Sequence, residues 1–129
     1  MILALTIQDL RVIRELEMAP APGINVISGD NGAGKTSVLE AVYLAGRGRS
    51  FRHNEAKPLI REGADEVRVI AKISDSFDGP PMTLGLSRDR RHFRCRVDGQ
   101  DVKKRSVLAE TLPVQWVSSQ PQLFLELGP

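Results

Sequence analysis

The stretch Gly29-Asp30-Asn31-Gly32-Ala33-Gly34-Lys35-Thr36, followed by Ser37, decides the fold of this chain. It fits the pattern G-x-x-x-x-G-K-[ST], in which a glycine-rich loop cradles phosphate groups at the start of a helix. Residues 24–28 before it are short, apolar and β-branched, which predicts a buried parallel strand. Residues 38–45 after it contain no Gly or Pro and predict a helix. Strand, loop and helix together indicate a phosphate site, and they disfavour a chance match in a glycine-rich turn.

Each residue type in the loop has a physical role. Glycines allow a tight backbone whose N–H groups point at phosphate oxygens, and the helix adds its positive N-terminal end. Lys35 supplies a full charge to the β- and γ-phosphates, and the Thr36 hydroxyl is placed to ligate Mg²⁺. Ser37 is expected in the first helical turn and is the weaker metal ligand. The candidate phosphate-binding residues are Gly29, Asp30, Asn31, Gly32, Ala33, Gly34, Lys35, Thr36 and Ser37.

Length and composition indicate one cytoplasmic domain. The chain has 129 residues, of which 41% are hydrophobic, and no apolar run approaches the roughly 20 residues that span a membrane. No basic region precedes residues 1–5, so they do not form a secretory signal. The single cysteine, Cys95, excludes an internal disulfide and suits a reducing compartment.

The net charge of +2 is unevenly distributed along the chain. Residues 1–45 carry three basic and five acidic side chains, whereas residues 88–105 carry eight basic and three acidic ones. Within that second stretch Arg94 and Arg96 alternate with apolar residues and share one face of a predicted strand. This patch is typical of phosphate contacts with nucleic acid. The alternative is a solvated row of charges that guards a strand edge.

The expected elements give an α/β fold. Residues 3–12 and 14–18 predict two strands, residues 36–46 a helix, and residues 66–102 an antiparallel meander with Asp98-Gly99 as a hairpin turn. Residues 106–111 predict a short helix with Ser106 as its candidate cap, and residues 112–117 a further strand.

This order of elements resembles the front half of an ABC-type ATPase head, and more closely the RecF family of bacterial recombination-repair proteins. The resemblance covers essentially the whole chain. It is carried by the loop, by Ala45-Gly46-Arg47-Gly48-Arg49-Ser50-Phe51-Arg52, by Leu59-Ile60-Arg61-Glu62-Gly63-Ala64, by Asp98-Gly99 with Lys103-Lys104, and by Leu112-Pro113-Val114. It implies that residues 1–129 are the N-terminal lobe of a RecF-type P-loop NTPase head, with a strand–helix unit at the loop and an antiparallel β region at about 66–102.

The resemblance also implies a function. RecF-like proteins are cytoplasmic ATP-binding and DNA-binding factors of DNA replication, damage response and repair, which act at single-stranded or gapped DNA and in recombinase loading. The implied cofactors are ATP and Mg²⁺. The implied partners are DNA, the recombination-mediator protein RecR and a second copy in an ATP-dependent homodimer, with no membrane.

Two further site residues follow from the resemblance. Arg11 is expected to contact the nucleotide, although Asp9-Leu10-Arg11 lacks the aromatic residue that usually precedes this arginine in the family. Gln120 is expected to act in catalysis by bridging Mg²⁺ and the attacking water; Gln115, inside a predicted strand, is the weaker choice, and an ordinary loop residue is the alternative for Gln120.

RecF proteins are far longer, and no apolar strand here ends in the Asp-Glu pair of their Walker B motif. The chain therefore resembles an N-terminal fragment that hydrolyses essentially no ATP by itself.

Three rival functions share the loop. An ABC transporter ATPase usually stacks adenine on an aromatic residue ahead of the loop, and no aromatic residue precedes Tyr43. A small-molecule kinase would need lid arginines and a compact parallel sheet, against which the meander argues. A fragment that binds no nucleotide stably on its own stays open.

Overall fold

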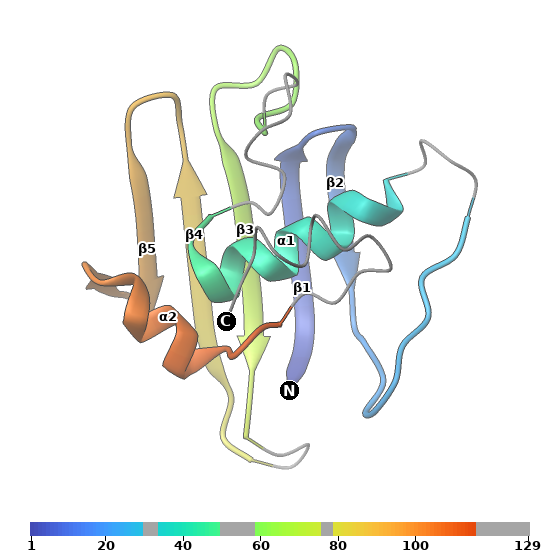
Figure 1. Ribbon diagram of the computed structural model, residues 1–129, viewed down its shortest axis with the longest axis vertical. Coiled ribbons are helices and arrows are strands. Elements are labelled where there is room, and N and C mark those ends of the chain that lie inside the picture. Colours follow the sequence, from blue (N-terminus) through green and yellow to red (C-terminus); the bar gives the residue numbers. More distant parts are fainter. Residues whose placement is uncertain (30–33, 50–58, 76–78, 116–129) are drawn as a thin grey trace.

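The computed structural model of the chain describes residues 1–29, 34–49, 59–75 and 79–115. These residues form one antiparallel sheet in the order β2-β1-β3-β4-β5-β6. Both helices lie over the same face of the sheet, so the fold has two layers (Figure 1). The elements are β1 (Ile2–Leu10), β2 (Ile13–Met18), α1 (Lys35–Arg47), β3 (Val67–Ile73), β4 (Met82–Arg88), β5 (Phe93–Val97), β6 (Gln100–Val102) and α2 (Arg105–Thr111).

The core lies between the two layers and follows from the period-two pattern of the strands. In β3 the side chains alternate strictly between buried and exposed, and the same alternation places Leu84 and Leu86 of β4 and Cys95 of β5 inside. The apolar stripe of α1 covers these residues. The core residues are Leu5, Ile7, Leu10, Val38, Ala41, Leu44, Ala45, Val67, Val69, Ala71, Ile73, Leu84, Leu86, Cys95, Leu108 and Leu112.

The N-terminal strands belong to the same sheet as the later meander. Both predicted strands are present, but β1 pairs with β3, bringing Leu5 opposite Ala71 and Ile7 opposite Val69. The antiparallel region therefore begins at residue 2 and extends well beyond the expected 66–102. The alternation of apolar and polar residues predicts where the strands lie. The pairing of β1 with β3, which are separated by some sixty residues, depends instead on tertiary packing.

The predicted parallel strand at residues 24–28 is not formed. Ile24 is 94% exposed and Val26 is 86% exposed, and the segment pairs with no strand in the described part of the chain. Its shape is set locally, since the Asn25 side chain bonds the N–H and the carbonyl of Ala21 at 2.9 and 2.8 Å. β-Branched composition favours a strand only where a neighbour offers backbone partners and apolar cover. The strand half of the expected strand–helix unit is thus corrected to a largely exposed segment without strand pairing, of which Ile27 packs against the core.

The helix after the loop ends as the sequence predicts. Gly48 adopts a left-handed conformation with φ 73° and donates its N–H to the Leu44 carbonyl at 2.7 Å. Two residues earlier, Gly46 lets residues 112–114 approach: an added Cβ would lie 2.5 Å from the Leu112 carbonyl oxygen and would overlap Val114. No helix in the described residues is long and apolar enough to span a bilayer.

Two predictions at the C-terminal side are wrong. The N-cap of α2 is Lys104 in an extended conformation, so Ser106 lies inside the helix and does not cap it. Residues 112–115 form no strand, because they pass over α1, where the Val114 carbonyl accepts a 2.9 Å hydrogen bond from Arg47 Nε. Residues 116 and 117 lie outside the described residues.

Candidate nucleotide-binding site

The phosphate-loop sequence leads directly into the N-terminus of α1. Gly34, with φ 95°, is the residue that caps the helix, and its carbonyl accepts the first helical hydrogen bond from Val38 N at 3.0 Å. A positive φ of this size is open to glycine at little cost. Lys35 turns its ammonium group back to donate to the carbonyl of Gly29, so the two described ends of the loop meet at this side chain. The helix N-terminus and Lys35 thus place positive potential at one point.

The two hydroxyl residues of the first turn differ in exposure. The side chain of Thr36, which follows Lys35, is exposed, whereas Ser37 is 4% exposed and packs into the molecule. Of these two residues, Thr36 is therefore the one whose side chain is accessible to an ion in solvent. Asp30, Asn31, Gly32, Ala33 and Gln120, expected as phosphate, catalytic or metal residues, lie outside the described residues. Within the described ranges, no group of three or more His, Cys, Asp or Glu side chains could hold a metal ion.

The turn between β1 and β2 packs directly against this loop. A Cβ placed on Gly34 would lie 3.3 Å from Ile13 Cγ1 and 3.5 Å from Val12 Cγ2. The turn is built on Asp9 and Arg11, whose φ values of 55° and 53° are left-handed. Hydrophobic side chains of the sheet layer thus form one wall of the phosphate loop.

Arg11 joins that turn to α1 through a buried ion pair. Its Nε and Nη2 groups donate to the two carboxylate oxygens of Glu40, both at 3.0 Å. The Arg11 side chain is 8% exposed and that of Glu40 is fully buried. A two-pronged, charge-assisted pair of this kind fixes both partners in position. The family resemblance predicted a nucleotide contact for Arg11, which the structure does not test, and sequence reasoning missed Glu40. The available signal for Glu40 was an acidic residue within the otherwise apolar stripe of the helix.

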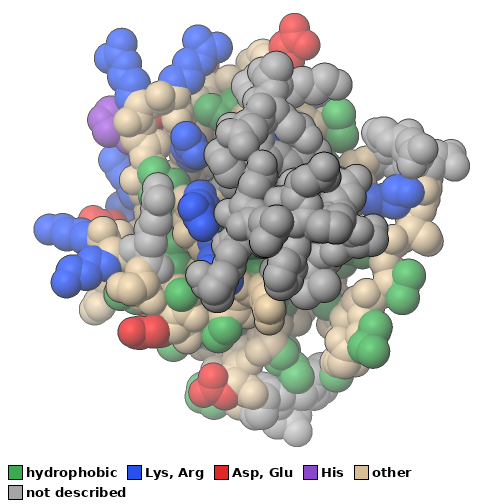
Figure 2. All heavy atoms as spheres, viewed as in Figure 1, with side chains coloured by type: hydrophobic (Ala, Val, Ile, Leu, Met, Phe, Trp, Pro, Cys, Tyr) green, Lys and Arg blue, Asp and Glu red, His purple; other side chains and the backbone are tan. Residues whose placement is uncertain are grey.

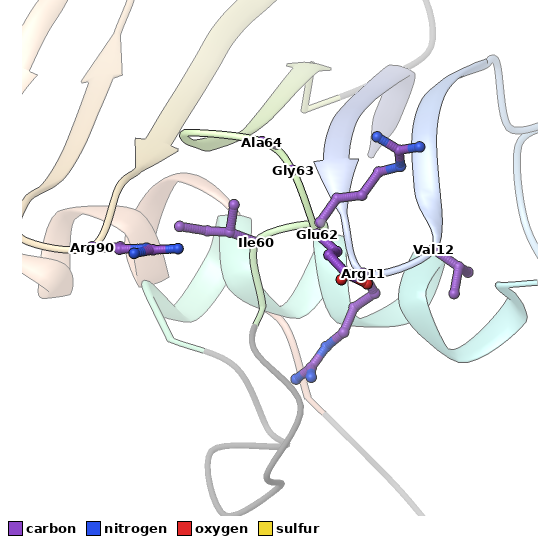
Figure 3. A pocket seen from close by; sticks show the side chains of 8 residues that line it. Arg11, Val12, Ile60, Glu62, Gly63, Ala64 and Arg90 are labelled. Carbon is purple, nitrogen blue, oxygen red and sulfur yellow. The ribbon is translucent and has the colours of Figure 1, made fainter.

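A depression of about 620 Å³ opens beside this turn. Figure 3 shows Arg11 and Val12 on one side of it, the segment from Ile60 to Ala64 at its centre, and Arg90 on the opposite side. The segment is tied to the turn by backbone hydrogen bonds of 2.8 Å, from Arg11 N to the Leu59 carbonyl and from Arg61 N to the Asp9 carbonyl. Arg11, Arg61 and Arg90 line the depression together with Glu62. Arg11 is paired with Glu40, and Arg61 Nη1 lies 3.8 Å from Asp9 Oδ1, so acidic side chains balance much of this positive charge.

The basic stretch, residues 88–105, runs from the end of β4 through β5 and β6 to the start of α2, at one end of the strand order. Lys and Arg side chains gather over the turn between β4 and β5 and along β5 (Figure 2). In that turn the Asp89 carboxylate accepts hydrogen bonds from the backbone N–H groups of Arg91 and His92, at 2.8 and 2.6 Å. These two bonds, together with the nearby His92 ring, lower the pKa of Asp89. Burial raises the pKa of the Cys95 thiol on the inner face of β5.

The face assigned to Arg94 and Arg96 is confirmed. Both point away from the helices, while Cys95 between them is buried. Asp98 and Gly99 form the predicted tight turn into β6, with φ values of 50° and 82°.

A G-x-x-x-x-G-K-[ST] sequence that leads into the N-terminus of a helix is the signature of the class of P-loop NTPases. Comparison with known families agrees. The chain belongs to the family described as RecF/RecN/SMC N terminal domain, whose model matches residues 1–119. This is a family of ATPase heads other than the transporter ATPases weighed above.

Curated relatives extend the comparison over nearly the whole chain. The protein named DNA replication and repair protein RecF from Thioalkalivibrio sulfidiphilus is 37% identical over 125 residues, which cover 97% of this chain and 35% of that protein. Its namesake from Nitrosococcus oceani is 41% identical over 125 residues, covering 97% and 34%. The chain therefore spans about a third of the length of these relatives.

Solved structures confirm the fold. The recombination mediator protein RecF in its ATPrS form superposes with a TM-score of 0.74 at 21% identity, covering 84% of this chain and 29% of that one. The ATP form of RecF gives the same TM-score at 22% identity, with 84% and 30% covered. The α/β class and the N-terminal part of an ABC-type head, expected from the sequence, are thus confirmed.

Proposed function

We propose that this chain is the N-terminal lobe of a RecF-type head that binds ATP with Mg²⁺ and takes part in DNA repair. The observation that carries the proposal is the convergence of Lys35, Gly29 and the N-terminus of α1 on one point, beside the wall made by Val12 and Ile13. Charge, helix dipole and backbone N–H groups together are suited to the phosphates of a nucleotide. The names of the relatives and the ATP-bound structures supply the class of function.

Magnesium fits the residues present at this end of the helix. The accessible hydroxyl of Thr36 is a hard oxygen donor next to the proposed phosphate position, as such an ion requires. When bound, Mg²⁺ would neutralise phosphate charge. Gln120 stays a proposed second ligand, with a proposed part in positioning water.

Arg11 enters the proposal through the turn on which it lies. Two of its donor groups bond Glu40 while its neighbours Val12 and Ile13 pack on Gly34. We propose that this pair holds the wall of the loop in place, so that the nucleotide contact expected of Arg11 is made from a fixed position.

The larger assembly follows from the relatives and is proposed here for the protein that contains this lobe. Two heads would close on ATP, the closed pair would hold DNA, and the recombination-mediator protein RecR would act with it. The basic surface around β5 supports the DNA part of this proposal, since clustered arginines favour phosphate contacts.

Titration with a fluorescent ATP analogue and Mg²⁺ tests nucleotide binding. The variant Lys35→Ala removes charge-assisted hydrogen bonds worth roughly 1.5–3 kcal/mol, so affinity should fall about 10-fold to 100-fold. Lys72→Ala is the matched control, because Lys72 is an exposed lysine of β3 far in sequence from the loop. Equal affinity for wild type and Lys35→Ala would remove the assignment. No binding by any form would favour the remaining alternative, a lobe that holds no nucleotide alone, for which the exposed segment before the loop is the supporting observation.

A further inference from the structure

The outer face of the sheet carries a shallow groove that is separate from the nucleotide loop. On this face the register aligns side chains of β3, β4 and β5 in two rows: Arg68, Ser87 and Arg94 form the first, and Ile70, Gly85 and Arg96 form the second. The groove has a volume of about 360 Å³, and these six residues line it together with Leu86. Residues that alternate with them, such as Val69 and Leu84, are fully buried, so the groove faces away from the helices.

Gly85 opens the floor of the groove. A Cβ at this position would meet nothing within 4 Å, so the space above it belongs to the groove. Ile70, its neighbour on β3, is 37% exposed and gives that floor an apolar surface. A strand interior that places glycine between an exposed isoleucine and an arginine leaves room for a ligand group to approach the backbone closely.

Arginines stand on both sides of this floor. Arg68 lies on one side and Arg94 on the other, with one strand between them, so their backbones are about 10 Å apart. Long side chains at this separation can both reach an anion bound over Ser87. Arg96 follows Arg94 by two residues on the same face, so the positive charge continues along β5.

The present partners of these arginines are exchangeable. Arg68 pairs with Glu66 at 2.6 Å and Arg96 with Asp101 at 2.9 Å, both on the exposed surface. Exposed pairs contribute only about 0–1 kcal/mol, so a phosphate could replace the carboxylates at little cost. Across the described ranges Arg94 has no ion-pair partner.

Edge protection accounts for at most one of these three arginines. β3 lies between β1 and β4 over its length, whereas β6 pairs only with Cys95, Arg96 and Val97 of β5. The start of β5, where Arg94 lies, therefore has a strand neighbour on the β4 side alone in the described sheet. The edge strands of the described sheet are β2 and β6. The alternative weighed from the sequence, a row of charges that guards a strand edge, therefore applies to Arg94 but does not explain Arg68 or Arg96.

We infer that this groove binds the sugar-phosphate backbone of a nucleic-acid strand. The planar fork of arginine matches phosphate oxygens, and an arginine on each side of a narrow floor suits a chain that carries a charge at every unit. The flat apolar surface of Ile70 and Gly85 suits the sugar and base faces between phosphates. The inference rests on the proposed function in taking DNA as the ligand, and it adds where the strand lies and that β3 contributes through Arg68.

Fluorescence anisotropy of a labelled oligothymidylate, titrated with the chain at about 50 mM salt and upward, tests the groove. In Arg94→Gln/Arg96→Gln the affinity should fall about tenfold or more. The slope of log affinity against log salt should shrink by about 0.7 for each phosphate of the single strand that the variant no longer neutralises. The matched control is Arg91→Gln/Lys103→Gln, which removes the same charge from exposed positions of the same basic stretch outside the groove. Its affinity should change less than about threefold.

A second variant changes no charge. Gly85→Val fills the floor of the groove with a residue that strands favour, and the open space above Gly85 accommodates it without a clash. We expect an unchanged melting temperature and an affinity for the oligonucleotide reduced several-fold. Wild-type affinity in Gly85→Val, or equal losses in the two double variants, would overturn the groove in favour of a diffuse basic field.

The remaining outcomes separate this inference from the proposed function. Polyglutamate that competes as well as the oligonucleotide would identify an acidic protein as the partner and overturn the nucleic-acid assignment. Nucleotide binding without any oligonucleotide binding would overturn the groove and leave the ATP proposal intact. Groove-dependent oligonucleotide binding with equal nucleotide affinity in wild type and Lys35→Ala would overturn the ATP proposal and support the groove.

Discussion

Two stretches of this chain are similar in composition, but one is a paired strand of the sheet and the other is unpaired and mostly exposed. β3 (Val67–Ile73) and residues 24–28 are both short, apolar and β-branched. β3 pairs with β1 on one side and β4 on the other, and every second side chain of it is buried under α1. Residues 24–28 pair with no described strand, and Ile24 and Val26 face solvent.

The difference shows that strand propensity is realised by neighbours. The same β-branched side chains that stabilise β3 against Leu84 and Leu86 have nothing to pack on at Ile24. At Gly34, where the loop sequence enters α1, the neighbours are instead Val12 and Ile13 at the turn between β1 and β2, and the ion pair of Arg11 with Glu40 joins that turn to α1. Substitutions can test this difference, because they should lower the free energy of unfolding in β3 and leave it nearly unchanged in residues 24–28.

The largest effect on stability is expected at the Arg11–Glu40 ion pair, which joins the turn between β1 and β2 to α1. Glu40→Ala leaves Arg11 buried without its carboxylate, and breaking a buried pair in this way costs about 3–5 kcal/mol in the free energy of unfolding. Urea denaturation followed by circular dichroism measures it. The control is Arg11→Met/Glu40→Leu, which replaces both charges with apolar side chains and should lose much less than the single variant. A loss below about 1 kcal/mol in Glu40→Ala would mean that the pair does not hold the turn.

The next prediction compares the cost in stability of the same substitution, Ile→Ala, in the two stretches. Ile73→Ala at the end of β3 removes a buried side chain, which is 4% exposed, and should cost about 2–5 kcal/mol. Ile24→Ala removes the same atoms from a side chain in solvent and should stay within about 0.5 kcal/mol. Urea denaturation of both variants gives the comparison directly. A comparable cost at Ile24 would show that the segment packs against the protein in solution and would break the contrast.

The sequence predicts most of the individual strands, helix ends and turns, but little of the pairing between strands that are distant in the chain. The alternation in β3, β4 and β5, the glycine stop of α1 and the turn at Asp98-Gly99 all depend on nearest neighbours, and each is confirmed. The pairing of β1 with β3 joins residues far apart in the chain, and no local pattern encodes it. The strand expected at residues 24–28 fails for the same reason, since a pattern specifies which side chains could be buried and does not supply the partner.

The residues of the candidate site also fall into those that the sequence predicts and those that only the folded structure reveals. The loop pattern locates Lys35 and Thr36 at the helix N-terminus from sequence alone. Glu40 was missed because only the folded turn brings Arg11 to it, and Arg68 was missed as part of the basic surface because it enters through the register of β3 with β4. Neither contact leaves a spacing signal along the chain.

The smallest effect concerns two turns that are each held by one polar side chain. Asn25 bonds the backbone of Ala21 before the exposed segment, and Asp89 bonds the backbone N–H groups of Arg91 and His92 between β4 and β5. Only the second depends on charge. Because the pKa of Asp89 is lower in the folded chain than its ordinary value of 3.8, its carboxylate stabilises the fold above that value. The contribution is lost as the pH falls through the lowered folded pKa.

Urea midpoints of wild type, Asp89→Asn and Asn25→Ala, measured from about pH 7 down to about pH 2, test this difference. We expect wild type to exceed Asp89→Asn by a small margin at neutral pH, since the amide keeps one acceptor oxygen but loses the charge. The margin should close below about pH 4, where the unfolded chain takes up the proton and the folded one follows. The margin between wild type and Asn25→Ala should not change with pH, because an amide does not titrate. A margin for Asp89→Asn that stays constant down to the lowest pH would show that the turn is held by geometry alone, as the turn at Asn25 is.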